Sequence, residues 1–87
     1  MQVSSSSHFD KNLVKLYKSD SSYKAKVAKT VKELVNLNPA TPGSIMIHKL
    51  SGTENYSISV DMSIRIVCRW RQNEIFLSDI GKHEDVY

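Results

Sequence analysis

The last residues of the chain carry side chains that could act together on a phosphodiester. Lys82, His83 and Tyr87 lie at or near the end of the sequence, and Arg65 lies upstream in an apolar segment. An imidazole can move a proton near neutral pH, a lysine or arginine can bind phosphate, and a flat ring can stack on a base. These residue types suit the cleavage of RNA, so we expect the chemistry in this tail and at Arg65.

The composition is that of one small globular domain, residues 1–87. No apolar run approaches the roughly 18 residues that a membrane span needs, and no signal-peptide pattern opens the chain, so we expect a cytoplasmic protein. The single cysteine, Cys68, excludes an internal disulfide and a multi-cysteine zinc site. We expect no metal and no cofactor.

Positive charge is concentrated in the first half of the chain. Up to Asn38 there are seven lysines and three acidic residues, a balance of +4, whereas the three arginines all come later, at Arg65, Arg69 and Arg71. The lysines are typical of a solvated helix face. The alternative interpretation is attraction toward a polyanion or an acidic partner.

Two stretches have the apolar period of amphipathic helices. The first covers roughly residues 8–18 after a serine suited to cap it, and the second covers roughly 22–37 and ends before Pro39. A polar turn at 19–22 joins them and supplies the second cap. A connection this short predicts an antiparallel helix hairpin.

After a loop at residues 39–43 the apolar period changes to two, which predicts strands. Four strands are expected, with a fifth more weakly indicated at the start of the chain: 44–49, 56–61, 64–71, 74–80 and 1–5. Short turns between strands favour antiparallel neighbours. The sequence therefore predicts an α+β fold, with the N-terminal helix hairpin packed on one face of a twisted, mainly antiparallel sheet of four or five strands.

Strand alternation also predicts which side chains share a face of this sheet. If the apolar residues of 56–68 face the helices, the opposite face receives Ser57, Ser59, Arg65 and Arg69, and His48 joins them. An antiparallel sheet can leave one face in water. We therefore expect basic and hydroxyl groups to converge on one open surface that could hold a phosphodiester.

The order of two helices and four strands resembles the RelE/ParE superfamily of toxins from type II toxin–antitoxin modules. Four segments are similar to its mRNA-interferase branch: 47–52, 56–60, 64–67 and 79–87. The closing Gly-x-His-x-x-x-aromatic pattern, from Gly81 to Tyr87, is the most specific part and is similar to the YafQ type. The resemblance implies a RelE-like fold over nearly the whole chain.

The resemblance also implies roles for individual residues. Arg65 matches an arginine that holds the scissile phosphate, and His83 matches a C-terminal histidine, for which we expect proton transfer as the general acid. Tyr87 matches the terminal aromatic and would contact the flanking nucleotide. His48 matches a further histidine and is the candidate general base.

The remaining candidate residues are expected to bind the RNA substrate and not to take part in proton transfer. Arg69, Lys82, Lys49 and Ser59 are expected to contact RNA or phosphate. Ser59 and Ser63 are aligned with a histidine and an aspartate of the YafQ type, and a serine does not titrate at neutral pH.

The activity that the resemblance implies is ribosome-dependent cleavage of mRNA in the ribosomal A site, without a metal. The 2′-hydroxyl would attack the adjacent phosphate and leave a 2′,3′-cyclic phosphate and a 5′-hydroxyl. A cognate antitoxin is the implied protein partner. Two alternatives remain at this point: a ParE-type inhibitor of DNA gyrase, and a toxin-like module that binds a partner without catalysis.

Overall fold

The computed structural model describes residues 2–36, 54–82 and the short segment 47–49. The elements follow the order β1 (Gln2–Ser5), α1 (Ser7–Ser19), α2 (Tyr23–Val35), β2 (Ile47–Lys49), β3 (Tyr56–Ser59), β4 (Ile64–Arg71) and β5 (Glu74–Lys82). Both helices and all five strands were expected near these positions. Strand β3 ends two residues earlier than predicted, and β5 continues two residues further.

The two helices begin in different ways. At the start of α1, the Ser6 hydroxyl accepts a hydrogen bond from the Phe9 amide at 3.0 Å, which is the expected serine cap. The residue at the cap position of α2 is Ser22, which lies in the expected 19–22 turn, but its side chain makes no capping hydrogen bond. Instead, the Asp20 carboxylate accepts hydrogen bonds from the amide and the hydroxyl of Ser22, which fixes the turn between the helices.

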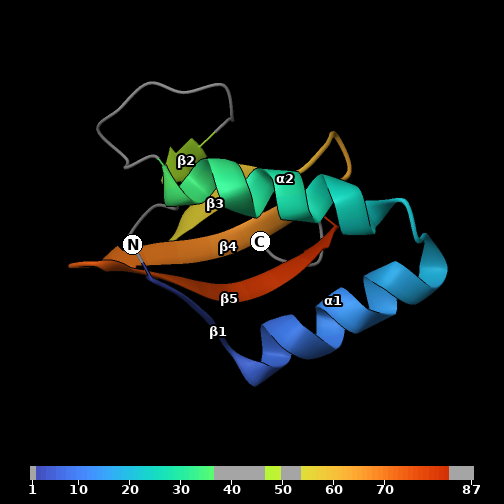
Figure 1. The fold of residues 1–87 in the computed structure, drawn as a ribbon, viewed down its shortest axis with the longest axis horizontal. Coiled ribbons are helices and arrows are strands. Elements are labelled where there is room, and N and C mark those ends of the chain that lie inside the picture. Colours follow the sequence, from blue (N-terminus) through green and yellow to red (C-terminus); the bar gives the residue numbers. More distant parts are fainter. Residues whose placement is uncertain (1, 37–46, 50–53, 83–87) are drawn as a thin grey trace.

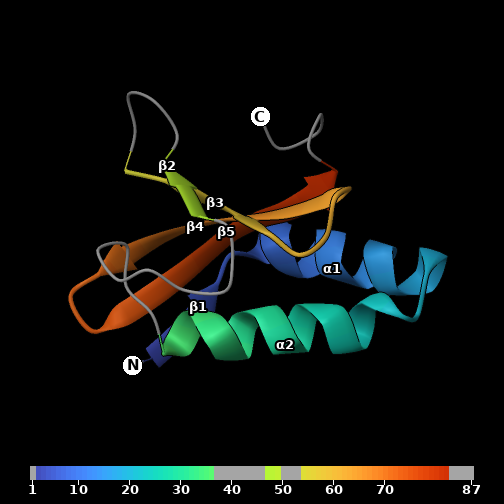
Figure 2. The same ribbon diagram turned by 90° about the horizontal axis from the view of Figure 1, so that it is seen from above.

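The strands form one mixed sheet in the order β1-β5-β4-β3-β2. Strand β1 is parallel to β5, and the other neighbouring pairs are antiparallel. Figures 1 and 2 show both helices on one face of a twisted sheet, with α1 beside β5. The α+β prediction is confirmed, including the fifth strand.

The core lies between the helices and this face of the sheet. Ile58, Ile66, Ile75 and Ile80 are fully or almost fully buried in the sheet, and α2 contributes Leu34. Cys68 lies among them, and burial raises the pKa of its thiol to about 12, so it is a small apolar residue of the core and not a nucleophile. No helix of the described residues is long and apolar enough to cross a bilayer.

A β-bulge at Ser78 changes which residues of β5 face the helices. Val67 of β4 pairs with Asp79 and Cys68 pairs with Leu77, so Ser78 has no opposite residue. Its hydroxyl donates to the Val67 carbonyl at 3.1 Å. Because of the extra residue, the buried positions shift from odd numbers at Leu77 to an even number at Ile80. The bulge thereby sets the register of Gly81 and Lys82 against β4.

Candidate functional site

Arg65 has a small neighbour on either side of it in the sheet. It lies in β4 directly opposite Ser59 of β3 and Gly81 of β5. Directly paired residues of antiparallel strands project from the same face. Since glycine has no side chain, β5 places no side chain beside Arg65, and β3 offers only a hydroxyl. The Arg65 side chain is half-buried, and the space beside it is not filled from either strand.

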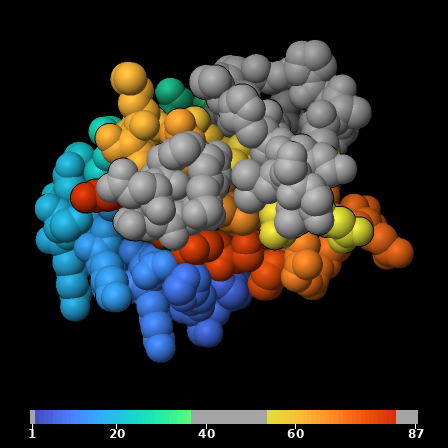
Figure 3. Space-filling model, turned by 180° about the vertical axis from the view of Figure 1, so that it is seen from behind, coloured from blue at the N-terminus to red at the C-terminus, as the bar shows by residue number. Residues whose placement is uncertain are grey.

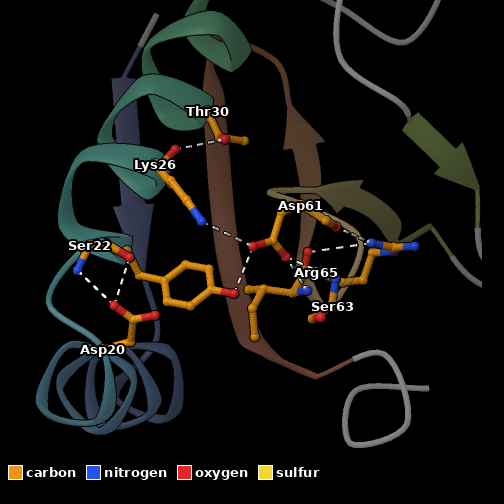
Figure 4. Close-up of polar contacts among 9 residues, drawn as sticks. Asp20, Ser22, Lys26, Thr30, Asp61, Ser63 and Arg65 are labelled. Atoms are coloured by element: carbon orange, nitrogen blue, oxygen red, sulfur yellow. Dashed lines mark hydrogen bonds and ion pairs between the residues drawn. The ribbon is translucent and has the colours of Figure 1, made fainter.

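The turn between β3 and β4 orients the Arg65 guanidinium. Its Nη1 donates to the backbone carbonyl of Asp61 at 2.7 Å, and a longer contact of 3.5 Å reaches the Ile64 carbonyl (Figure 4). Among the described residues, Arg65 makes no ion pair with a carboxylate. A guanidinium has five N–H donors. Within the described residues, most of these donors and the positive charge are not used by another side chain.

Asp61 connects this turn to α2. Its Oδ1 accepts hydrogen bonds from the amides of Ser63 and Ile64, each at 2.9 Å. Its Oδ2 accepts the hydroxyl of Tyr23 at 2.6 Å and lies 3.6 Å from the ammonium of Lys26. Figure 4 shows these contacts converging on one carboxylate. The carbonyl that holds Arg65 is therefore part of a turn fixed by a helix 38 residues earlier in the chain.

These contacts shift the pKa of the Asp61 carboxyl and of the Tyr23 hydroxyl. Burial alone would raise the pKa of Asp61, but the hydrogen bonds from Tyr23, Ser63 and Ile64 outweigh it, so the pKa lies below its ordinary value. The hydrogen bond to Asp61 raises the pKa of Tyr23 to about 12. At neutral pH the pair is therefore a neutral phenol that donates to an ionised carboxylate.

We expect Asp61→Ala to lower the free energy of unfolding by about 1–2 kcal/mol at pH 7, because it removes charge-assisted hydrogen bonds. A carboxylate with a depressed pKa in the folded state stabilises above the unfolded-state pKa of about 3.9, and this contribution is lost as the pH falls through the folded-state pKa. The difference from wild type should therefore shrink below about pH 4. Urea unfolding at pH 7 and pH 3 measures it.

Tyr23→Phe is the matched variant, since it removes one donor to the carboxylate and keeps the ring. Its free energy of unfolding should be about 1 kcal/mol lower than that of wild type at pH 7, and this difference should also shrink below about pH 4. Equal stability losses at both pH values would contradict the assigned role of the Asp61 charge.

The structure separates two of the expected phosphate-binding residues from Arg65. Lys82 pairs with the buried residue Ile64, so it projects on the side of α1 and not on the side of Arg65. Arg69 projects from the same face as Arg65, but four residues along the strand, which is about 13 Å at 3.3 Å per residue. Of the expected set, only Ser59 lies directly beside Arg65 among the residues with described side chains.

The prediction of one continuous open surface was wrong in the middle of the sheet. Ser57 is fully buried and Val67 is 6 % exposed, although both project away from the helices. Strand alternation assigns a residue to a face but does not determine whether that face is covered. The accessible groups therefore divide into two areas, one at Arg65 and one at Arg69.

The other sequence candidates are described only in part. The backbones of His48 and Lys49 lie in β2, opposite Ser57 and Tyr56 respectively. His83 and Tyr87 lie outside the described residues. Their roles stay predictions.

Sequence reasoning missed a polar cluster between α1 and the end of β5. The Asp79 carboxylate accepts a hydrogen bond from the Asn12 amide at 2.8 Å and lies 3.4 Å from the Nε2 of His8. The cluster lines an open groove of about 520 Å³, which Lys15 and Lys82 also border. His8 and Asn12 are four residues apart on one helix face, and this spacing was the available signal. Nothing in the sequence indicated that Asp79 would lie beside them.

Among the described residues, no group of three or more His, Cys, Asp and Glu side chains could hold a metal ion. The described part of the site consists of the Arg65 guanidinium, the Ser59 hydroxyl and the turn held by Asp61. This arrangement can bind an oxyanion.

No protein-family model and no curated protein sequence matches the chain. Solved structures do match its fold. A metal-bound toxin from Helicobacter pylori superposes with a TM-score of 0.83 at 23 % identity, over 100 % of this chain and 99 % of that one. The Escherichia coli DinJ-YafQ toxin-antitoxin complex contains a chain with a TM-score of 0.79 at 17 % identity, covering 99 % and 96 % of the two chains.

A third similar structure is the YoeB dimer from Staphylococcus aureus. Its TM-score is 0.75 at 19 % identity, over 95 % of this chain and 97 % of that chain. At these identities the comparisons establish the fold: this chain has the architecture of the YafQ and YoeB toxins over 95–99 % of its length.

Proposed function

We propose that this chain, which has the fold of the YafQ and YoeB toxins, is the toxin of a type II toxin–antitoxin module and cleaves mRNA. One observation carries the proposal. Arg65 is held by the carbonyl of Asp61 at 2.7 Å, has no carboxylate partner among the described residues, and lies beside Gly81 and Ser59. A guanidinium that is held in place, has two small neighbours in the sheet and makes no ion pair within the described residues suits the scissile phosphate.

The proposed reaction uses the 2′-hydroxyl of the substrate as the nucleophile. Its oxygen attacks the adjacent phosphorus while the bond to the 5′ oxygen breaks, which leaves a 2′,3′-cyclic phosphate and a 5′-hydroxyl. Arg65 would neutralise charge on the phosphoryl oxygens. His83 would give a proton to the leaving 5′ oxygen, and His48 would take one from the 2′-hydroxyl. Tyr87 would stack on the neighbouring base.

The dependence on the ribosome and the position of the mRNA in the A site rest on the resemblance. A cytoplasmic location belongs to the same proposal.

The antitoxin partner has a suitable surface on the helical side of the molecule. An apolar groove of about 510 Å³ runs between β1, α1 and α2, where Phe9, Leu13 and Val27 contribute to its lining and Lys32 borders it. The helices also carry most of the lysines. We propose that an acidic segment of the antitoxin, with apolar residues at regular spacing, occupies this groove.

The experiment that tests the function reads the ends of transcripts after the chain is expressed in bacteria. New 5′-hydroxyl ends within coding sequences are the expected result, and they should disappear when the cognate antitoxin is present. Relaxed or linearised plasmid DNA without new RNA ends would instead indicate the ParE-type alternative. Unchanged RNA and DNA would indicate a module that only binds a partner, an alternative that Ser59 and Ser63 favour.

A further inference from the structure

Two arginines and a phenylalanine form a cluster at the far end of the sheet from the Asp61 turn. The guanidinium carbon of Arg69 lies 5.4 Å from the ring centroid of Phe76, and that of Arg71 lies 4.7 Å from it. Arg69 is directly opposite Phe76 in the β4–β5 pair. We call these three residues the arginine–phenylalanine cluster. Two cations beside one ring concentrate positive charge and flat surfaces in a small area.

The donors of this cluster are largely unused within the described residues. The Nε atom of Arg69 is buried without a hydrogen-bond partner, so an anion would have to meet the terminal nitrogens of this guanidinium. Arg71 makes one ion pair, with Glu74 at 3.9 Å, and its side chain is half exposed. Ion pairs of this length at an exposed site contribute little. Both guanidiniums therefore keep donors for an anion.

The cluster shares its face with Arg65. Residues 65, 69 and 71 of one strand project to the same side, and this side faces away from the helices. Figure 3 shows this face, with the orange atoms of the β4–β5 hairpin at one end. The turn at Gln72, whose φ is 36°, closes the hairpin directly beside the cluster. The two accessible areas lie toward opposite ends of this face, so a polyanion long enough to span the buried middle could contact both.

We propose that the arginine–phenylalanine cluster is a second contact for single-stranded RNA, which binds phosphate and stacks a base some nucleotides away from the one held at Arg65. This inference rests on the proposed function. An unpaired base stacks well on a guanidinium plane or an aromatic ring, and guanidinium forks bind phosphate in two places. A ring backed by guanidinium groups offers both kinds of contact without reading sequence.

The test measures binding of fluorescent single-stranded RNA by anisotropy, with 2′-O-methyl residues that block cleavage. Two lengths serve as probes: one long enough to reach from Arg65 to the cluster, and one too short to do so. We expect Arg71→Ala to weaken binding of the long probe by roughly tenfold and to leave the short probe unchanged. The slope of the logarithm of the binding constant against the logarithm of the salt concentration should also become less steep for the long probe, by the amount of about one phosphate contact.

Two further variants separate stacking from charge and from folding. Arg71→Lys keeps the charge but loses the plane, so it should recover only part of the affinity. Lys29→Ala removes one charge from α2 in the opposite layer and should change neither probe. The inference is overturned if the wild type binds both lengths equally well, or if Arg71→Ala and Lys29→Ala weaken the long probe to the same extent.

The result also distinguishes this inference from the proposed function. If wild type binds the long probe through Arg71 but expression produces no new RNA ends, the cluster is an RNA site on a protein that does not cleave. If RNA ends appear while Arg71→Ala binds normally, cleavage is supported and the second contact is wrong. A duplex of the same length serves as an additional probe, and tighter binding of the duplex would overturn the assignment to single strands.

Discussion

Replacing Arg65 with alanine is expected to slow RNA cleavage by about 10²–10³-fold, which is the effect of removing one main donor to a developing oxyanion. The loss should appear mainly in kcat, because the charge on the phosphoryl oxygens grows in the transition state. The measurement is the rate of cleavage of an mRNA in a translating extract. Arg65 is held by a backbone carbonyl, so its removal breaks no ion pair among the described residues.

Arg65→Lys is the informative partner of this variant. A lysine keeps the charge but cannot bind two phosphate oxygens with one planar group, so only part of the rate should return. Thermal unfolding followed by circular dichroism checks that both variants fold. Cleavage within twofold of wild type by folded Arg65→Ala would show that the phosphate is held elsewhere, and the site proposed here would have to be abandoned.

Replacing His83 with glutamine is expected to lower cleavage by about 10²–10⁴-fold if this residue is the general acid. Glutamine can still form hydrogen bonds but cannot give up a proton near neutral pH. An ordinary imidazole has a pKa of about 6.5, so the wild-type rate should fall as the pH rises above that range. The variant should lack this dependence, which a rate profile between pH 5 and pH 9 would record.

A truncation provides an independent test of the same tail. Strand β5 extends through Lys82 and pairs with β4 over its whole length, so a chain that ends at Lys82 keeps every strand residue. This shorter chain should fold, bind its antitoxin and fail to cleave. If it folds and arrests translation as well as wild type, neither His83 nor Tyr87 takes part in the reaction.

The elements of this fold could be predicted because their signals are local. The apolar period identified both helices, and strand β4 has the predicted bounds, Ile64–Arg71. The same alternation correctly assigned Arg65 and Ser59 to one face. These patterns depend on neighbours a few residues apart, so one sequence contains them in full.

Most of the missed features involve residues far apart in the chain. Tyr23 reaches Asp61 across 38 residues, and Asn12 reaches Asp79 across 67. The bulge at Ser78 decided that Lys82, which was expected to assist Arg65, projects toward α1 instead. A change of one residue in register moves every following side chain to the other face, and periodicity does not reveal where such a change occurs.

The sequence by itself thus determined which groups are available for chemistry and which face of β3 and β4 carries Ser59 and Arg65. Only the tertiary structure decided which of these groups meet. It placed Arg65 between Ser59 and Gly81, fixed its guanidinium through the Asp61 turn, buried Ser57, and brought Arg69 and Arg71 to one ring. The physical reason is that strand pairing, its register and side-chain packing between segments set these neighbours, and the conformational preference of single residues does not.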